Sequence, residues 1–204
     1  MKKCLLVALL ILVVCVSAFA NSVSFDAGYG FGFGSVKPSI EGITGNSVNV
    51  SWTELPLAVS YRHNVYENVG VVGKIGVTFP LSYKINNNEG STENMPNEFN
   101  FGVKASYELP IEKKLNFVGT LGVQYSYATK TTSSVVTTYS KFELDSDLLV
   151  EYEVAKNLSI RGGLNIGIPL FENWKMSLPT TTSNMKISDF RMSVAPVVGV
   201  AYQF

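Results

Sequence analysis

Apolar and polar residues alternate strictly along residues 22–34, which read SVSFDAGYGFGFG. The odd-numbered positions from 23 to 33 are all apolar, whereas the even-numbered positions are serine, aspartate and then glycines. Strict alternation over this length predicts a β-strand with one apolar and one polar face. This segment alone does not show which of the two faces contacts water.

The same alternation recurs in seven further segments of the chain. They span residues 55–62, 69–83, 99–109, 115–127, 142–154, 158–170 and 190–204. After the first 20 residues, no long segment has the period of a helix. The sequence therefore predicts an all-β fold of eight antiparallel strands in up-and-down order.

The connections between these segments alternate in length. Only a few residues follow positions 62, 109 and 154, whereas longer polar stretches follow positions 34, 83, 127 and 170. An even number of strands, with short turns at one end and long loops at the other, is the arrangement of bacterial outer-membrane barrels. Both termini are then expected at the end with the short turns.

Residues 1–20 have the pattern of a secretory signal peptide. Two lysines precede an apolar run, and Ala18 and Ala20 occupy the small-residue positions before a predicted cleavage site at Asn21. An uncleaved anchor is disfavoured because the apolar run is short for a membrane span. Lipoprotein processing at Cys15 is disfavoured because Val14 is not small. We expect one mature domain over residues 21–204.

The mature chain has little that suits nucleic acid or thiol chemistry. Both cysteines lie in the signal segment, so no disulfide is expected. Removing the two signal lysines leaves 14 basic against 16 acidic residues, a formal net charge of −2. This balance argues against nucleic acid as a partner.

Alternation alone leaves two folds open, a membrane barrel with its apolar face toward lipid and a soluble lipocalin-like carrier with that face inside. Glycines on the polar face favour the membrane barrel, because the narrow lumen of eight strands needs small residues beside larger polar ones. Aromatic residues on the apolar face favour it too, since they gather at the strand ends as in the girdles of membrane barrels. They are Tyr61, Tyr107, Phe117, Tyr152 and Tyr202 near the short turns, and Phe33, Phe79, Tyr83, Phe99, Tyr125, Tyr127 and Phe190 near the long loops.

The chain ends in VGVAYQF, a predicted strand that reaches Phe204. This ending resembles the C-terminal assembly signal of outer-membrane barrels. The segments ELPLAVSYR and GKIGVTFPLSY are similar to the second and third strands of the small opacity-type and outer-membrane-protein-A-type barrels. The resemblance covers essentially the whole mature chain, through its pattern rather than through diagnostic residues.

The resemblance implies an integral protein of the bacterial outer membrane, surrounded by outer-membrane lipid, with periplasmic termini and extracellular long loops. It also implies that the barrel-assembly machinery recognises the strand ending at Phe204. Larger members of the outer-membrane-protein-A type carry a periplasmic domain that binds peptidoglycan. We expect none here, because the sequence ends with its last strand.

Charged residues on the polar face should pair inside the lumen, because buried charges need partners. From their heights on neighbouring strands we expect three salt bridges, Asp26 with Arg62, Lys74 with Glu108, and Glu151 with Arg161. Such pairs would plug the lumen. The alternative is a thin aqueous path along the acidic wall of Glu143, Asp145 and Asp147, which would make a small pore for ions or small apolar solutes.

The sequence offers no catalytic or metal site. Members of this family that cut peptides or edit acyl chains use serine, histidine and carboxylate groups on the barrel, but the only histidine here, His63, lies beside a predicted short turn. No cluster of histidine and cysteine is present to bind a metal. We therefore expect neither an enzyme nor a cofactor.

The predicted loops carry the remaining functional signal. They are rich in serine, threonine and asparagine, and one contains Trp174, a weak candidate for ligand binding. Trp174 could instead rest on the barrel rim. Polar loops on a rigid barrel suit a structural or surface-interaction role, adhesin-like, with a host or matrix ligand at the loops.

Overall fold

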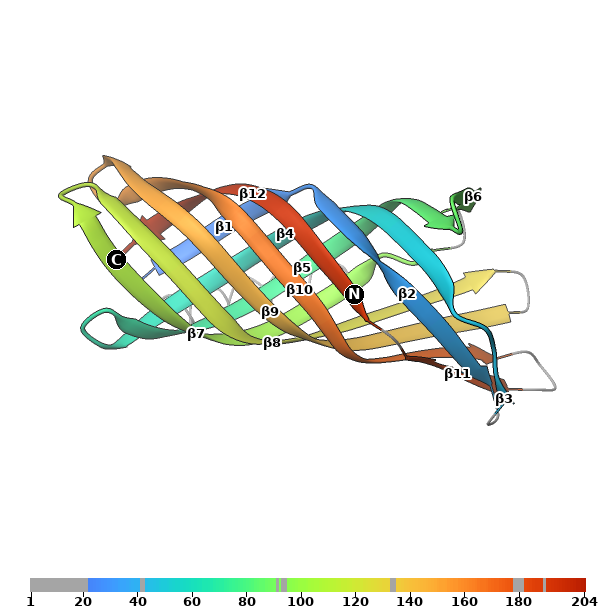
Figure 1. Cartoon of the computed structure of the whole chain (residues 1–204). Helices are drawn as coiled ribbons and strands as arrows, with labels where there is room; N and C mark the ends of the chain where they lie inside the picture. Colours follow the sequence, from blue (N-terminus) through green and yellow to red (C-terminus); the bar gives the residue numbers. More distant parts are fainter. Residues whose placement is uncertain are drawn as a thin grey trace.

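The computed structural model describes residues 22–40, 43–90, 92, 95–132, 135–177, 182–188 and 190–204. The predicted signal peptide lies outside the described residues. Within the described ranges, no helix has the length and apolar character needed to cross a bilayer. Their secondary structure is almost entirely antiparallel β-sheet (Figure 1).

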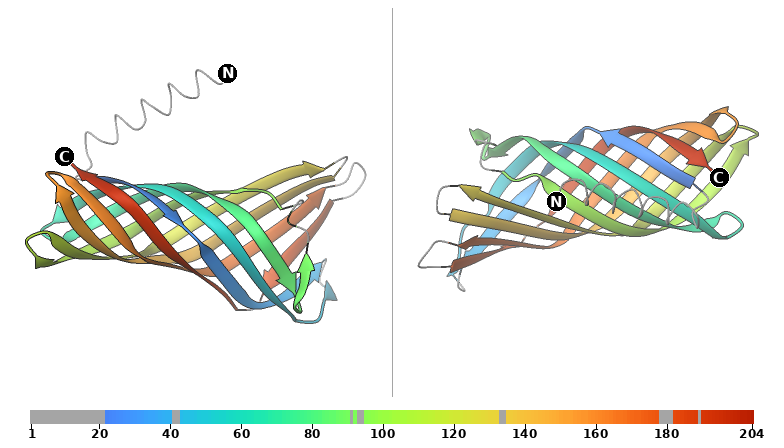
Figure 2. Two further views of the ribbon diagram at one scale, coloured as in Figure 1. Left: turned by 90° about the horizontal axis from the view of Figure 1, so that it is seen from above. Right: turned by 180° about the vertical axis from the view of Figure 1, so that it is seen from behind.

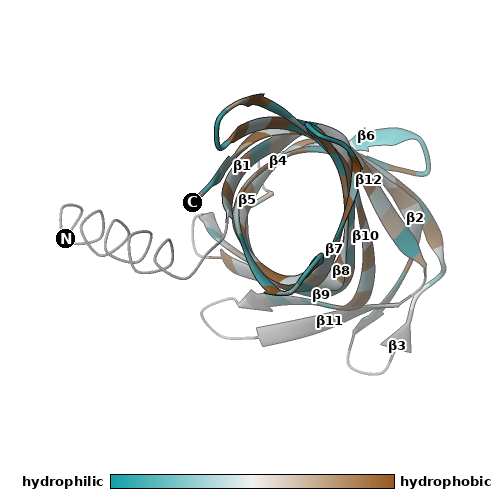
Figure 3. Cartoon of the chain, turned by 90° about the vertical axis from the view of Figure 1, so that its left-hand side faces the viewer, coloured by the Kyte–Doolittle hydropathy of each residue, from teal (hydrophilic) through white to brown (hydrophobic). Residues whose placement is uncertain are grey.

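The sheet closes into a ring of eight strands, which confirms the predicted all-β class and strand number. The ring strands are β1 (Ser22–Gly28) continued by β2 (Gly30–Ile40), then β4 (Val48–Tyr66), β5 (Val69–Ile85), β7 (Glu98–Glu112), β8 (Leu115–Thr132), β9 (Val135–Ala155), β10 (Leu158–Ser177) and β12 (Arg191–Gln203). Each pairs with the next along the chain, and β12 pairs with both β10 and β1. The last pairing leaves no free edge in the ring, as the end view in Figure 3 shows.

The strands continue well beyond the lengths that the sequence pattern predicted. The stretch after residue 127 was expected to be a polar loop, but β8 and β9 stay paired as far as Thr132 and Val135. Likewise β10 pairs with β9 as far as Ser177. Serine- and threonine-rich segments have no apolar face, so alternation does not predict them as strands. They still pair, because strands are joined by backbone hydrogen bonds.

Three short strands extend the sheet at the end away from the short turns. They are β3 (Ile43–Thr44), β6 (Asn88–Gly90) and β11 (Thr182–Ser188), paired with β2, β5 and β10 respectively. The C-terminus lies at the opposite end, beside the short turns (Figures 1 and 2). We call the end that carries β3, β6 and β11 the mouth.

Asparagine and glutamate residues in left-handed backbone conformations make the tight turns. Asn86 and Asn87 both have positive φ, of 48° and 68°, as the two central residues of a type I′ hairpin turn require. Glu67 and Asn157 have positive φ in two of the short turns. Asparagine tolerates this region better than most residues do, which explains its place in three of these four positions.

The apolar face of the sheet points outward and the polar face points into the lumen. On β7, Phe101 and Val103 are 56% and 61% exposed, whereas Lys104, the residue after Val103, is 1% exposed. Phe25 on β1 and Ile160 on β10 are about half exposed in the same way. Outward apolar side chains therefore surround the barrel, and the soluble carrier, which needs the reverse orientation, is contradicted.

One predicted outward residue faces the lumen instead. Tyr83 was expected in the outer aromatic girdle, but it pairs with Trp52 and lines a cavity at the mouth. A β-bulge between Thr53 and Glu54 shifts the register of β4 against β5 just below this pair. An extra residue in one strand reverses the facing of everything beyond it, so alternation counted through a bulge gives the wrong face.

Candidate functional site: the charged lumen and its mouth

Charged side chains occupy the lumen in three layers, ordered from the short turns to the mouth. The short-turn layer consists of Asp26, Arg62, Glu108, Glu151 and Arg161, the central layer of Lys74, Lys104, Asp145 and Asp147, and the mouth layer of Glu98, Lys141, Glu143, Glu172 and Arg191. Each layer contains both signs of charge. The six lumen candidates chosen from the sequence all lie in the first two layers.

Two arginines organise the short-turn layer. Arg161 Nε donates to Asp26 Oδ1 over 2.6 Å, and its Nη1 donates to Glu151 Oε1 over 3.2 Å. Arg62 Nη2 lies 3.1 Å from Glu108 Oε2 and 3.6 Å from Glu151 Oε2. Glu151 therefore links the two arginines into one chain of ion pairs. The expected pair of Glu151 with Arg161 is present.

The expected pair of Asp26 with Arg62 is not formed, because Asp26 binds Arg161 instead. Both Asp26 and Arg161 are register partners of Gly199, one on each side of it. A Cβ at position 199 would lie 2.3 Å from Asp26 Oδ1, so only glycine leaves the two ions room to meet. Comparing neighbouring strands in the sequence does not reveal this pair, which crosses an intervening strand.

The expected pair of Lys74 with Glu108 is also replaced. Lys74 Nζ lies 3.0 Å from Asp145 Oδ2, on the far side of the lumen, while Glu108 binds Arg62. A lysine side chain is long enough to cross a narrow barrel, so height along the barrel axis decides its partner more than strand adjacency does.

Lys104 is the centre of the central layer, and the sequence reading gave it no partner. Its Nζ lies 2.6 Å from Asp145 Oδ2 and 2.7 Å from Asp147 Oδ2, and its side chain is fully buried. Lys104 and Asp145 flank Gly122, which repeats the arrangement around Gly199. A glycine in register between two opposite charges could therefore have predicted this ion pair.

Neutral polar side chains complete the central layer. Asn165 Nδ2 donates to Asp145 Oδ1 over 2.5 Å and to Asp147 Oδ1 over 2.7 Å. Thr120 Oγ1 donates to Asp147 Oδ2 over 2.8 Å. Between this layer and the short-turn layer lies a cavity of about 30 Å³, which has room for about two water molecules.

The mouth layer pairs both of its cations with carboxylates, Lys141 with one on its own strand β9 and one on β7, and Arg191 on β12 with one on β10. Lys141 Nζ lies 3.0 Å from Glu143 Oε2 and 3.4 Å from Glu98 Oε2. Arg191 forms an ion pair with Glu172. The strand predicted from the sequence begins at residue 142, so Lys141 has no predicted partner, although charged residues continue to alternate at 141, 143 and 145.

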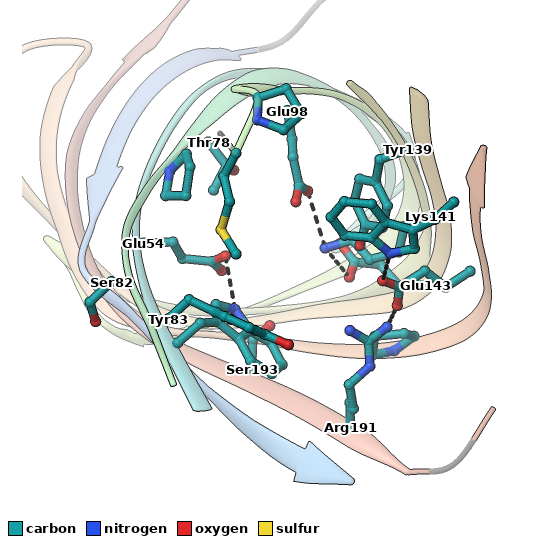
Figure 4. A pocket seen from close by; sticks show the side chains of 17 residues that line it. Glu54, Thr78, Ser82, Tyr83, Glu98, Tyr139, Lys141, Glu143, Arg191 and Ser193 are labelled. Carbon is teal, nitrogen blue, oxygen red and sulfur yellow. Dashed lines mark hydrogen bonds and ion pairs between the residues drawn. The ribbon is translucent and has the colours of Figure 1, made fainter. Parts of the chain in front are cut away.

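A cavity of about 80 Å³, which we call the mouth pocket, opens beside the mouth layer (Figure 4). Its aromatic walls are Trp52, Tyr83, Tyr139 and Trp174. Trp174 belongs to β10 rather than to a loop, which corrects the sequence reading. Its ring centre lies 4.7 Å from that of Tyr139, and its Nε1 donates to Glu172 Oε1 over 3.0 Å.

Glycines of the first alternating segment lie beside two side chains that line this pocket. Gly30 is the register partner of Glu54, and Gly32 that of Trp52. A Cβ at position 32 would lie 1.9 Å from the Trp52 ring, and one at position 30 would lie 2.6 Å from Glu54 Cγ. The glycines on the polar face thus make room for an indole and a carboxylate of the adjacent strand.

Tyr139 stands on the part of β9 that lies beyond the outward aromatic Phe142. Its ring is buried, with 5% of its surface exposed. Burial raises the pKa of its hydroxyl group above the ordinary value. The phenol therefore stays neutral at physiological pH and adds no charge to the mouth pocket.

Within the described residues, no group of three or more histidine, cysteine, aspartate or glutamate side chains is arranged to hold a metal ion. His63 is exposed on β4 near the short turn at Glu67, at the opposite end from the mouth pocket.

A closed barrel with an apolar outer surface and an ionic lumen defines a class, the transmembrane β-barrels of bacterial outer membranes. The chain belongs to the outer membrane protein beta-barrel domain family, whose family model matches residues 6–204. This confirms the resemblance drawn from the sequence and places the protein in the bacterial outer membrane. In that membrane the short turns face the periplasm and the mouth faces outward.

Solved structures show the same fold. The crystal structure of the outer membrane protein OprG from Pseudomonas aeruginosa aligns with a TM-score of 0.60 and 13% identity, over 91% of this chain and 96% of that one. The Neisserial surface protein A aligns with a TM-score of 0.56 and 12% identity, over 90% of this chain and 96% of that one. No curated protein sequence matches the chain significantly. At such low identity the likeness concerns the fold alone.

Proposed function

We propose that this barrel has a structural and surface-interaction role, adhesin-like, in which the lumen stays closed and the mouth meets partners outside the cell. The filled lumen supports this proposal most directly. Three layers of ion pairs cross it, and the cavity between the first two measures only about 30 Å³. The proposed role involves no catalysis.

The paired extensions of the barrel strands support the surface role. On β9 the last outward aromatic is Phe142, but the strand begins at Val135, so seven residues project beyond it, roughly 20 Å at about 3.3 Å per residue. The β8 and β10 strands flank this projection on both sides. A surface held by backbone hydrogen bonds loses less conformational entropy on binding than a flexible loop does.

The outer face of this projection is rich in hydroxyl groups. Thr129 and Thr131 on β8 are exposed, and Thr138 on β9 is the register partner of Thr129. Hydroxyl groups both donate and accept hydrogen bonds, which suits polar host or matrix surfaces such as glycans and glycoproteins. We refer to Thr129, Thr131 and Thr138 as the threonine face.

An adhesion assay tests the surface role. A non-adherent bacterial strain expressing the protein should be retained on basement-membrane matrix more than the same strain with an empty vector. Replacing the three residues of the threonine face by alanine should reduce retention at unchanged surface amount. The matched control is His63→Ala, at the opposite end of the barrel, which should leave retention unchanged. Retention no greater than that of the vector strain would refute the proposal.

A conductance measurement tests the closed lumen separately. The purified protein in planar bilayers should show no steady openings, because an ion would have to pass all three charged layers. Large and steady conductance would support the alternative role as a small pore for ions or small apolar solutes. Adhesion and conductance therefore separate the two roles by independent readouts.

Assembly in the cell forms a further part of the proposal. Phe204 is 62% exposed and its ring packs edge-on against Tyr202, with 5.2 Å between ring centres. An exposed aromatic at the end of the closing strand supports recognition by the barrel-assembly machinery. The outward apolar surface supports direct contact with outer-membrane lipid.

A further inference from the structure

The mouth pocket is larger than the cavity between the short-turn layer and the central layer. Its cavity of about 80 Å³ exceeds the cavity of about 30 Å³ between the lower layers. At about 10–15 Å³ for each water-sized sphere, it has room for roughly six small groups, such as methyl groups or water molecules. A small organic molecule fits this space.

The mouth pocket also differs in charge. Its lining carries four carboxylates, Glu54, Glu98, Glu143 and Glu172, against two cations, Lys141 and Arg191. The formal charge of the lining is therefore −2. The central layer, by contrast, balances two aspartates with two lysines. A cation bound in the pocket would offset this formal charge.

Glu54 is the carboxylate that remains without a cation. Both cations of the pocket are engaged elsewhere, Lys141 with Glu98 and Glu143, and Arg191 with Glu172. Within the described residues no ion pair reaches Glu54, whose Oε2 accepts a hydrogen bond of 3.1 Å from the indole of Trp52. Figure 4 shows its carboxylate on the opposite side of the cavity from Lys141.

Aromatic rings form the other walls of the pocket. Tyr83 lies on the side of Glu54, and Tyr139 on the side of Lys141 (Figure 4). Trp52 donates a hydrogen bond to Glu54, and the Trp174 ring packs against Tyr139. The faces of such rings attract cations, most strongly when water is excluded. Trp52 already attracts one, since the Arg191 guanidinium carbon lies 5.7 Å from its ring centre.

From this geometry we infer that the mouth pocket binds a small quaternary ammonium compound, held between the aromatic walls and the carboxylate of Glu54. A primary ammonium group has three N–H donors that need acceptors, and most carboxylates of the pocket are already engaged. A quaternary ammonium group has no donor to satisfy, so ring faces and one carboxylate suffice. A divalent metal ion is disfavoured because the described residues offer it no ligand cluster.

Intrinsic fluorescence reports directly on this site. The chain has two tryptophans, Trp52 and Trp174, and both line the mouth pocket. We would refold the protein in a nonionic maltoside detergent, which contains no quaternary ammonium group. Choline chloride would then be titrated at ionic strength held constant with sodium chloride, and tryptophan emission recorded. The neutral isostere 3,3-dimethylbutan-1-ol has the same shape without the charge and serves as the matched ligand.

The inference predicts a saturable change of emission with choline and at least about tenfold weaker binding of the isostere. Glu54→Gln should weaken choline binding by about tenfold, while Glu89→Gln, an exposed carboxylate on β6 outside the pocket, should leave it unchanged. Tyr83→Leu, which removes a ring and no charge, should also weaken binding. Heat-dependent gel mobility would show that each variant is folded.

Three results would overturn the inference. The first is the absence of a saturable change with choline in the unmodified protein. The second is equal binding of choline and the neutral isostere, which would mean that the cavity selects shape alone. The third is unchanged affinity in folded Glu54→Gln. The comparison of the two ligands on the unmodified protein decides the matter even if that variant fails to fold.

Discussion

Replacing Lys104 by methionine tests whether the central layer has to be electrically balanced. The Lys104 side chain is fully buried, and its Nζ lies within 2.7 Å of both Asp145 and Asp147. Methionine keeps an unbranched apolar stem and removes the charge. Two buried carboxylates would then share Lys74, the remaining cation in ion pairs with this layer among the described residues. Removing one partner of a buried ion pair costs about 3–5 kcal/mol.

Urea unfolding of the folded barrel in detergent or lipid vesicles, followed by gel mobility without boiling, measures this loss. With a slope of about 2 kcal/mol per molar urea, a loss of about 4 kcal/mol lowers the midpoint by about 2 M. The matched control is Lys84→Met. Lys84 pairs with Glu89 over 3.4 Å, both side chains are exposed, and the expected change is below about 1 kcal/mol.

A second substitution checks that charge imbalance is the cause. Combining Lys104→Met with Asp147→Asn leaves one lysine facing one aspartate, so more than half of the lost stability should return. The reasoning is refuted if Lys104→Met shifts the midpoint no more than Lys84→Met does. It is equally refuted if the double variant is as unstable as the single one.

Three further predictions concern the outer face, the glycine spacers and the C-terminus. Val103→Arg places a charge on the outward face of β7 and should lower stability in bilayers by about 2–4 kcal/mol, measured by urea unfolding in vesicles; an unchanged midpoint would contradict the outward orientation. Gly199→Ala brings a methyl group to 2.3 Å from a carboxylate oxygen and should cost about 1–3 kcal/mol in thermal unfolding, whereas Gly119→Ala, whose nearest neighbour would be 3.7 Å away, should cost little; equal effects would argue against the spacer role. Deleting Phe204 should reduce assembly in cells without preventing refolding in detergent, and Phe190→Ala, with the same 62% exposure at the other end, should assemble normally; normal assembly of the deletion would remove the case for a terminal signal.

The sequence determined the barrel because the residues of each strand alternate between apolar side chains that face lipid and polar side chains that face the lumen. Alternation along β7, with Val103 outward and Lys104 inward, is a local property that survives without knowledge of any neighbour. The number of alternating segments gives the number of strands, and the alternation within each segment gives the orientation of its apolar face in the closed barrel. The alternation did not predict the threonine-rich ends of β8 and β9, because these segments have no apolar face. It predicted the wrong face for Tyr83, because a bulge precedes this residue.

The ion pairs could be located in the lumen from sequence but not assigned to partners. Asp26 meets Arg161 rather than Arg62 because Gly199 between them has no side chain, and Lys74 reaches Asp145 across the barrel. These contacts depend on register and on lumen width, which arise only when the sheet closes.

Where no bulge intervenes, the sequence by itself thus determined which residues face lipid and which face the lumen, because facing is fixed by position along a strand. The tertiary structure alone decided that Trp52, Tyr83, Tyr139 and Trp174 surround one cavity with Glu54 left without a cation. Closing the sheet brings together residues from β4, β5, β9 and β10 that are far apart along the chain. No local pattern encodes that proximity, since it results from the stagger of eight strands around a common axis.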